Sequence, residues 1–146
     1  MLVRMMVALA IVMSLAIYSG QSHSGELALG LWTHHFNRDA PPEKCTNEKH
    51  DLMAYKFNGG LTMGMYNNSH CITSYLAGYT KDLYRGKSIR LGYSIAAVSG
   101  YPDHMHVVDG LIIIPSPHIA YVVGDVGIRV IYIPRLLVGA GFVYEF

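Results

Sequence analysis

Short segments in which large apolar residues alternate with small or polar ones constrain the fold of this chain most strongly. At residues 88–98 every second side chain is apolar, and the positions between hold Arg, Gly, Ser and Ala. A period of two predicts a β-strand with one apolar and one small or polar face. We expect eight such strands and no convincing helix. The strands are expected at residues 26–36, 51–57, 61–66, 71–80, 88–98, 107–123, 126–133 and 139–146.

Turn-forming residues separate these segments. Asn58-Gly59-Gly60 is a hairpin signal, and Asn67 to Ser69 and Gly124-Asp125 mark further turns. An even number of antiparallel strands joined by short turns is typical of a closed barrel. The sequence therefore predicts an all-β, eight-stranded antiparallel up-and-down β-barrel, with its sixth strand interrupted by Pro115 and Pro117.

Charge distinguishes a membrane barrel from a soluble one. Of the 146 residues, 51% are hydrophobic and only 14% are charged, whereas soluble domains carry about 25% charged residues. The expected outward faces carry almost no charge, so we interpret the chain as an outer-membrane-type barrel located in the cell outer membrane. A soluble barrel or sandwich is the alternative. The net charge of +1 indicates no nucleic-acid partner.

Both ends of the chain indicate export. Arg4 precedes an apolar run at residues 5–17, followed by small and polar residues, as in a secretory signal peptide. We assign residues 1–22 to this signal peptide and 23–146 to the barrel. A membrane anchor is the alternative, but a spanning helix needs about 20 apolar residues. The alternating Phe142, Tyr144 and Phe146 resemble the signal read by the barrel assembly machinery.

The two cysteines are expected at one end of the barrel. If both termini face the periplasm, the loop at 37–49 and the turn at 67–70 lie at the outer rim, which brings Cys45 close to Cys71. An even cysteine count in an exported chain predicts one disulfide between them, with two free thiols as the alternative.

Histidines gather at the same rim. A histidine beside a hydroxyl and a carboxylate suits acyl transfer, because base, hydroxyl and orienting acid act together. His104 and His106 would alternatively bind zinc, and a third interpretation is a polar rim without chemistry. The six rim histidines are His34, His35, His50, His70, His104 and His106.

The inward faces are expected to be charged near the periplasmic end. Lys56, Arg90, Arg129 and Glu145 fall there, and Arg129 is expected to pair with Glu145. Because buried charges persist only when paired, we interpret these residues as a structural floor. The lumen above it has room for one hydrocarbon chain. The expected lining residues are Ala28, Gly30, Gly64, Ile72, Leu76, Gly92 and Ala96.

Several segments resemble the lipid A palmitoyltransferase family of Gram-negative outer membranes. Tyr66-Asn67-Asn68-Ser69, with Ala77-Gly78-Tyr79 further along, aligns with the family's aromatic-Lys-Asp-Ser segment and its later Ala-Gly-Tyr. The segments Leu31-Trp32-Thr33-His34-His35-Phe36 and Tyr132-Ile133-Pro134 agree as well. The resemblance implies an eight-stranded barrel that transfers an acyl chain from a phospholipid to lipid A, without metal or cofactor.

The resemblance also implies site residues. The family's Ser corresponds to Ser69 and its Asp to Asn68, where an amide replaces the carboxylate. The family's His falls nominally on Thr33, beside His34 and His35. Strand parity is expected to turn His34 inward and His35 outward, and we favour His35 as the catalytic histidine.

The mechanism that the resemblance implies is acyl transfer at the outer rim. His35 removes the proton of the acceptor hydroxyl, Glu48 or Asn68 orients the histidine, and Ser69 with backbone amides stabilises the oxyanion. The phospholipid is expected to reach the lumen where prolines weaken strand pairing, at Pro115 and Pro117 or at Pro134. Thr80 stands where the family has the glycine that sets acyl length, which predicts a shallower pocket.

A non-enzymatic barrel is the alternative function, as a structural, adhesion or phage-borne surface protein. A zinc-dependent outer-leaflet hydrolase is a third hypothesis. A lipid A 3-O-deacylase is disfavoured because the expected sixth strand contains no His-x-Ser-Asn segment. Rim residues that converge above an open lumen favour the acyltransferase, and scattered residues above a filled lumen favour the non-enzymatic barrel.

Overall fold

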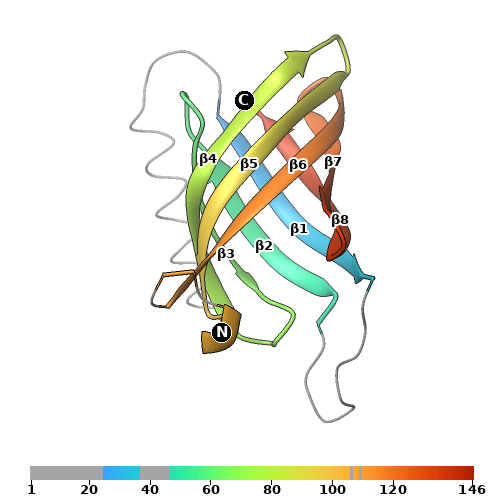
Figure 1. Cartoon of the computed structure of the whole chain (residues 1–146). Helices are drawn as coiled ribbons and strands as arrows, with labels where there is room; N and C mark the ends of the chain where they lie inside the picture. The colour runs from blue at the N-terminus through green and yellow to red at the C-terminus, as the bar shows by residue number, and fades with distance from the viewer. Residues whose placement is uncertain (1–24, 37–46, 106, 109) are drawn as a thin grey trace.

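The computed structural model describes residues 25–36, 47–105, 107–108 and 110–146. Eight antiparallel strands form one closed sheet, in which each strand pairs with the next and β8 pairs with β1 (Figure 1). The predicted all-β, eight-stranded up-and-down barrel is therefore confirmed. The strands are β1 (Glu26–His35), β2 (Lys49–Lys56), β3 (Leu61–Asn67), β4 (Thr73–Arg85), β5 (Ile89–Ser99), β6 (Leu111–Val123), β7 (Val126–Ile133) and β8 (Leu137–Glu145).

One short 3₁₀-helix, η1 (Asp103–Met105), lies between β5 and β6. Within the described ranges, no helix is long and apolar enough to cross a membrane. The connections β1–β2, β3–β4 and β5–β6 lie at the same end of the barrel, the lower end in Figure 1, which we call the rim.

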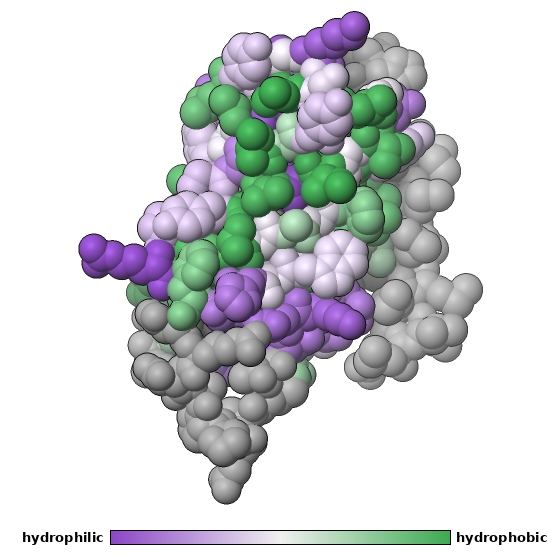
Figure 2. Space-filling model, turned by 90° about the vertical axis from the view of Figure 1, so that its right-hand side faces the viewer, coloured by the Kyte–Doolittle hydropathy of each residue, from purple (hydrophilic) through white to green (hydrophobic). Residues whose placement is uncertain are grey.

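Large apolar side chains face outward from the strands. On β5, Ile89, Leu91 and Ile95 are exposed while Arg90 and Val98 are buried, as the alternation predicts. Figure 2 shows hydrophobic residues gathered over the middle of one face, with hydrophilic residues toward both ends. The outward residues that are 40% to 51% exposed include Leu29, Ile95, Ile113, Ile119, Ile128 and Phe142. The barrel thus presents many large apolar residues to its surroundings.

Two strands differ from the sequence-based expectation. β4 continues to Arg85, beyond the end expected at residue 80. Asp82 on this extension lies 3.6 Å from the Lys56 ammonium, and pairing of its charge there is compatible with a strand at this polar position. β6 is not interrupted, because its register with β5 continues through Pro115 and Pro117.

The prolines affect the other edge of β6. Pairing with β7 begins only at His118 and Ile131, so Leu111 to Pro117 is not paired with β7. Alternate residues of a strand direct their N–H groups to the same neighbour, and prolines two positions apart therefore lack two donors on one side. The sheet between β6 and β7 is consequently open toward the rim.

A bulge at Gly30 exchanges the inward and outward faces of the second half of β1. Gly30 has a φ of 62°, and the register with β2 shifts between Leu29 and Leu31. A left-handed residue of this kind suits glycine, and one extra residue exchanges the two faces of the strand. The residues of β1 beyond Gly30 therefore have the opposite orientation to the one that uninterrupted alternation predicts.

Candidate functional site

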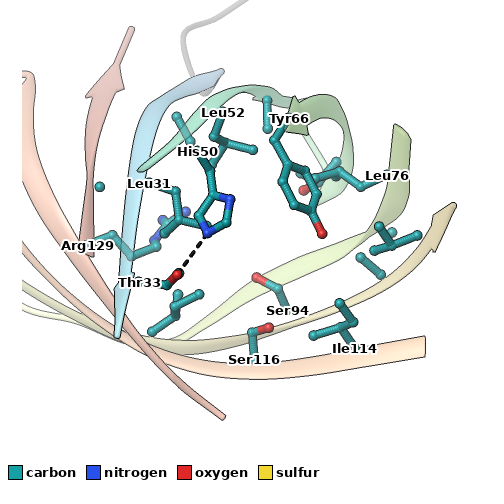
Figure 3. A pocket seen from close by; sticks show the side chains of 18 of the residues that line it. Leu31, Thr33, His50, Leu52, Tyr66, Leu76, Ser94, Ile114, Ser116 and Arg129 are labelled. Atoms are coloured by element: carbon teal, nitrogen blue, oxygen red, sulfur yellow. Dashed lines mark hydrogen bonds between the residues drawn. The ribbon is translucent and has the colours of Figure 1, made fainter. Parts of the chain in front are cut away.

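A pocket of about 180 Å³ lies inside the barrel. Figure 3 shows aliphatic side chains around it, with His50, Tyr66 and two serines directed toward the open space. Among the residues expected to line the lumen, four do so: Ala28, Gly30, Leu76 and Ala96. Ile72 was wrongly expected there, since it is 50% exposed in the β3–β4 turn.

Two expected lining glycines lie beneath other side chains. A Cβ on Gly64 would come within 2.6 Å of the Ala54 Cβ, and one on Gly92 within 2.7 Å of the His118 ring. These glycines let neighbouring side chains approach the wall closely. The Ala54 and His118 side chains thus occupy the places where Gly64 and Gly92 were expected to line the lumen.

The histidines at the end of β1 have the opposite orientation to that expected. His35 and Thr33 line the pocket, whereas the His34 side chain is 65% exposed. The bulge at Gly30 is the cause, because it exchanges the two faces of the strand. Of the two candidate bases, the structure therefore brings His35 to the lumen.

Glu48 lies beside the other histidine. Its carboxylate Oε1 is 3.9 Å from His34 Nδ1, and Glu48 is not among the pocket-lining residues. His34 also packs edge-on against Phe36, with ring centroids 6.2 Å apart. The predicted acid is therefore brought to His34, on the outward face of β1.

Ser69 lies at the mouth of the pocket together with two tyrosines. The Tyr66 and Tyr101 hydroxyls are 2.9 Å apart, and the Ser69 side chain is hydrogen-bonded to Tyr101. Burial raises the pKa of Tyr101, so its hydroxyl stays protonated and remains a donor. The mouth thus combines His35, Ser69 and two phenol groups above an apolar wall.

Asn68 is fully buried and holds the β3–β4 turn. Its Nδ2 donates to Ser74 Oγ at 3.0 Å and to the Gly100 carbonyl at 2.7 Å. Its Oδ1 accepts from the backbone amides of His70 at 2.8 Å and Ile72 at 3.1 Å. A carboxamide has two donors and two acceptor positions, and all are used here. This geometry favours a structural role over the orienting role expected from the sequence.

Replacing Asn68 with aspartate tests this structural role. The variant is expected to lose at least about 2 kcal/mol of unfolding free energy, because an unpaired carboxylate oxygen would face the Gly100 carbonyl. Urea titration of the protein in detergent micelles, followed by Trp32 fluorescence, measures the change. Asn67→Asp is the matched control, since the Asn67 Oδ1 accepts from Thr73 and aspartate preserves that acceptor. Unchanged stability together with faster acyl transfer in Asn68→Asp would contradict the structural assignment.

His50 is a site residue that the sequence interpretation left among the rim histidines. It is 5% exposed, and its Nε2 lies 2.8 Å from Thr33 Oγ1 while its Nδ1 lies 2.5 Å from the Asn67 carbonyl oxygen. The Tyr66 ring packs edge-on against it at 5.8 Å. Alternation on β2 already contained this signal, because Lys56 has the same parity and was expected to face inward.

A layer of hydroxyl groups lies beyond the apolar part of the pocket, on the side away from the rim. Thr62 donates to Thr80 at 2.9 Å, and the Thr80 and Ser94 hydroxyls are 2.9 Å apart. Ser116 faces Ser94 across β5 and β6 and also lines the pocket. Thr80 is buried within this layer. The hydroxyl groups therefore bound the apolar part of the pocket on the side away from the rim.

The charged floor contains more partners than expected. Arg129 donates to both Glu26 oxygens at 2.6 Å, and Lys56 lies 3.5 Å from the same carboxylate. The expected pair between Arg129 and Glu145 is therefore wrong. Glu145 instead accepts from Arg85 at 3.0 Å and lies 3.5 Å from Arg90. Closure of the barrel places β1 and β7 on either side of β8 and brings Glu26 to Arg129, which alternation within single strands does not reveal. The charged floor comprises Glu26, Lys56, Asp82, Arg85, Arg90, Arg129 and Glu145.

Comparison with protein-family models and with curated proteins finds no match to this chain. In the described part of the chain, no group of three or more His, Cys, Asp or Glu residues is arranged to hold a metal ion. His106 lies outside the described residues, so the zinc hypothesis at His104 and His106 stays a hypothesis.

Two further sequence predictions fall on residues outside the described ranges. The signal peptide at residues 1–22 is one of them. Cys45 is also outside, so the disulfide with Cys71 stays a prediction. Cys71 itself lies in the β3–β4 turn with a φ of 61°.

Proposed function

We propose that this protein is an outer-membrane barrel that transfers an acyl chain from a phospholipid to lipid A or a related lipid. One observation carries the proposal: His35 and Ser69 lie at the mouth of a single pocket with an apolar wall. A general base and a hydroxyl donor above a site for a hydrocarbon chain are the groups that acyl transfer needs.

The outward surface supports a membrane location. Large aliphatic and aromatic side chains are exposed on every strand except β2, whose exposed residues are Lys49 and Asp51. Extensive exposed apolar surface of this kind is unfavourable in water and typical of the lipid-facing side of a membrane barrel. Glu26, Lys56 and Arg129 of the charged floor lie inside, where they pair with one another.

The interior supports binding of one slim ligand. Leu31, Leu52, Leu76 and Ile114 contribute to an apolar wall that ends at the hydroxyl layer around Thr80. Transfer of an alkyl chain from water to such a wall lowers its free energy, whereas the hydroxyl layer offers no apolar contact. The carboxyl end of the chain would then remain at the mouth, beside His35 and Ser69.

The unpaired edge of β6 supports a lateral route for the lipid. Leu111 to Pro117 is not paired with β7, and this gap lies on the rim side of the barrel. A phospholipid in the outer leaflet would pass its acyl chain through this gap without opening a complete strand ladder. We propose this route in place of the alternative at Pro134.

Lipid analysis of Gram-negative cells tests the proposed function. Cells that lack their own lipid A acyltransferase of this kind and express the protein should contain lipid A heavier by one acyl chain in mass spectrometry. Ser69→Ala is expected to lower the product about 10²- to 10³-fold, because one donor to the oxyanion is lost. Ser88→Ala, on the turn before β5, is the matched control. Unchanged lipid A with the folded barrel in the outer membrane would refute the proposal.

A non-enzymatic barrel is the second candidate. The observation that favours it is the dispersal of three expected site residues, since Asn68 is used in a turn while His34 and Glu48 lie away from the pocket. In that case the lipid analysis shows no new species. Cells that express the wild-type protein and cells that express Ser69→Ala would then also have the same surface properties.

A further inference from the structure

Thr33 and His50 form a buried pair to which the chemistry of His35 and Ser69 assigns no role. Thr33 is 7% and His50 5% exposed, and both residues line the pocket. Figure 3 shows the His50 ring directed at Thr33, with the hydrogen bond between them drawn as a dashed line. Their hydrogen bond joins β1 to β2 on the inner face of the barrel.

The hydrogen bonds determine where the protons lie in the neutral ring. The Asn67 carbonyl oxygen is only an acceptor, so the His50 Nδ1 that lies 2.5 Å from it carries the hydrogen. The Nε2 of the same ring then presents a lone pair to Thr33 Oγ1, 2.8 Å away. We assign this tautomer from the hydrogen-bond pattern. Thr33 is therefore the donor, and its hydroxyl proton points at a base.

This order of groups is the one that activates a hydroxyl nucleophile. A hydroxyl within hydrogen-bond reach of an imidazole, whose other nitrogen is held by an acceptor, is the general arrangement of nucleophile, base and orienting group. The edge-on Tyr66 ring, 5.8 Å from His50, further restricts the imidazole. Thr33 lines the cavity in which the proposed function places the acyl chain.

We propose that Thr33 is a catalytic nucleophile and His50 its general base, so that transfer proceeds through an acyl ester on Thr33. This inference rests on the proposed function for the identity of the acyl donor. It adds a covalent intermediate to a reaction that His35 and Ser69 alone would carry out in one displacement.

The two half-reactions balance. In the first, Thr33 Oγ1 bonds to the carbonyl carbon of the phospholipid ester, its proton passes to His50 Nε2, and the ester bond to glycerol breaks. The glycerol oxygen then takes that proton from His50 and leaves as the hydroxyl of a lysophospholipid. In the second, the acceptor hydroxyl loses its proton to His35 and bonds to the acyl carbon. The Thr33 ester bond breaks, and the Thr33 oxygen takes up the proton that His35 received.

Covalent labelling tests the nucleophile. The probe is a decyl fluorophosphonate, which forms a stable bond from phosphorus to an activated hydroxyl oxygen and releases fluoride. The folded protein in detergent micelles is incubated with the probe and examined by intact-mass and peptide mass spectrometry. We expect one adduct on Thr33. Thr33→Val, which keeps the shape of the side chain, and His50→Gln should both label at least about 100-fold more slowly.

A second variant keeps the result interpretable. Thr33→Ser retains the hydroxyl and is expected to be labelled at the same position, at a rate close to that of the wild type. The heat-dependent change in gel mobility that distinguishes folded from unfolded barrels shows whether each variant is folded. Labelling of Thr33→Val at the wild-type rate, or an adduct on Ser69 instead, would overturn the assignment.

Lipid transfer measured in the same preparation separates this inference from the proposed function. If the wild type transfers acyl chains to lipid A but is not labelled, the nucleophile is wrong and the proposed function stands. If Thr33 is labelled and no lipid A product forms, the pair stands and the proposed acceptor is wrong. If neither labelling nor transfer occurs, both are overturned.

Discussion

Replacing Glu26 with glutamine is expected to lower the unfolding free energy of the barrel by about 3–5 kcal/mol. Glu26 is 3% exposed and accepts two hydrogen bonds of 2.6 Å from Arg129, with Lys56 3.5 Å from the same carboxylate. Glutamine has nearly the same shape, so packing is preserved while one negative charge is removed. Arg129 would then be left buried without its counter-charge, and Lys56 would keep only Asp82, which accounts for the large cost.

Urea titration in detergent micelles, followed by Trp32 fluorescence, measures this change. Trp32 is the only tryptophan of the chain and lies on the outward face of β1. Asp51→Asn, at an exposed position of β2, is the matched control and is expected to change stability little. A double variant, Glu26→Gln with Arg129→Met, should regain part of the loss, because it removes the unpaired cation as well. Equal stability of wild type and Glu26→Gln would show that the floor does not depend on this pair.

The second large effect is expected from His35→Ala, which should slow acyl transfer about 10²- to 10⁴-fold. His35 is the histidine of β1 that lines the pocket, and the proposed mechanism requires it to remove the proton of the acceptor hydroxyl. The rate of appearance of acylated lipid A, followed by mass spectrometry with purified protein, phospholipid and lipid A, measures this effect. Fluorophosphonate labelling of Thr33 should continue in this variant, since His50 acts in the first half-reaction.

His34→Ala is the matched control for this experiment. It removes the same kind of side chain one residue earlier, but the His34 side chain is 65% exposed and faces away from the lumen beside Glu48. Transfer should therefore remain close to the wild-type rate. A large loss in His34→Ala with none in His35→Ala would mean that the inward and outward assignments are reversed in the working enzyme.

Much of the fold could be predicted because side-chain direction in a strand is a local property. On β5, the alternation of Ile89, Leu91 and Ile95 with Arg90 places each side chain correctly. The same rule was wrong for His34 and His35, because it assumes an uninterrupted strand. A glycine at position 30 is compatible with both a regular strand and a bulge, and only pairing with β2 and β8 selects the positive φ.

The candidate site was predictable only in part. Ser69 lies at the mouth of the pocket, on the rim where it was expected, and the motif around it was the clearest signal in the chain. Asn68 was expected beside it in a catalytic role, but its hydrogen bonds depend on Gly100 and Ser74, which approach only in the folded barrel. The inward direction of His50 could have been predicted from its parity with Lys56. The inward direction of its partner Thr33 could not, because the bulge in β1 turns that residue inward.

Local alternation, together with the turn residues between the segments, is sufficient to specify the number of strands, their antiparallel succession and their apolar outward faces. The outward faces follow from the period of two and the antiparallel succession from the short turns, and both depend only on residues close together in the chain. Which polar groups meet in the lumen, such as Glu26 with Arg129 and Thr33 with His50, depends instead on how the sheet closes. Those contacts join residues far apart in the chain, and the register of barrel closure and one bulge place them within hydrogen-bond distance.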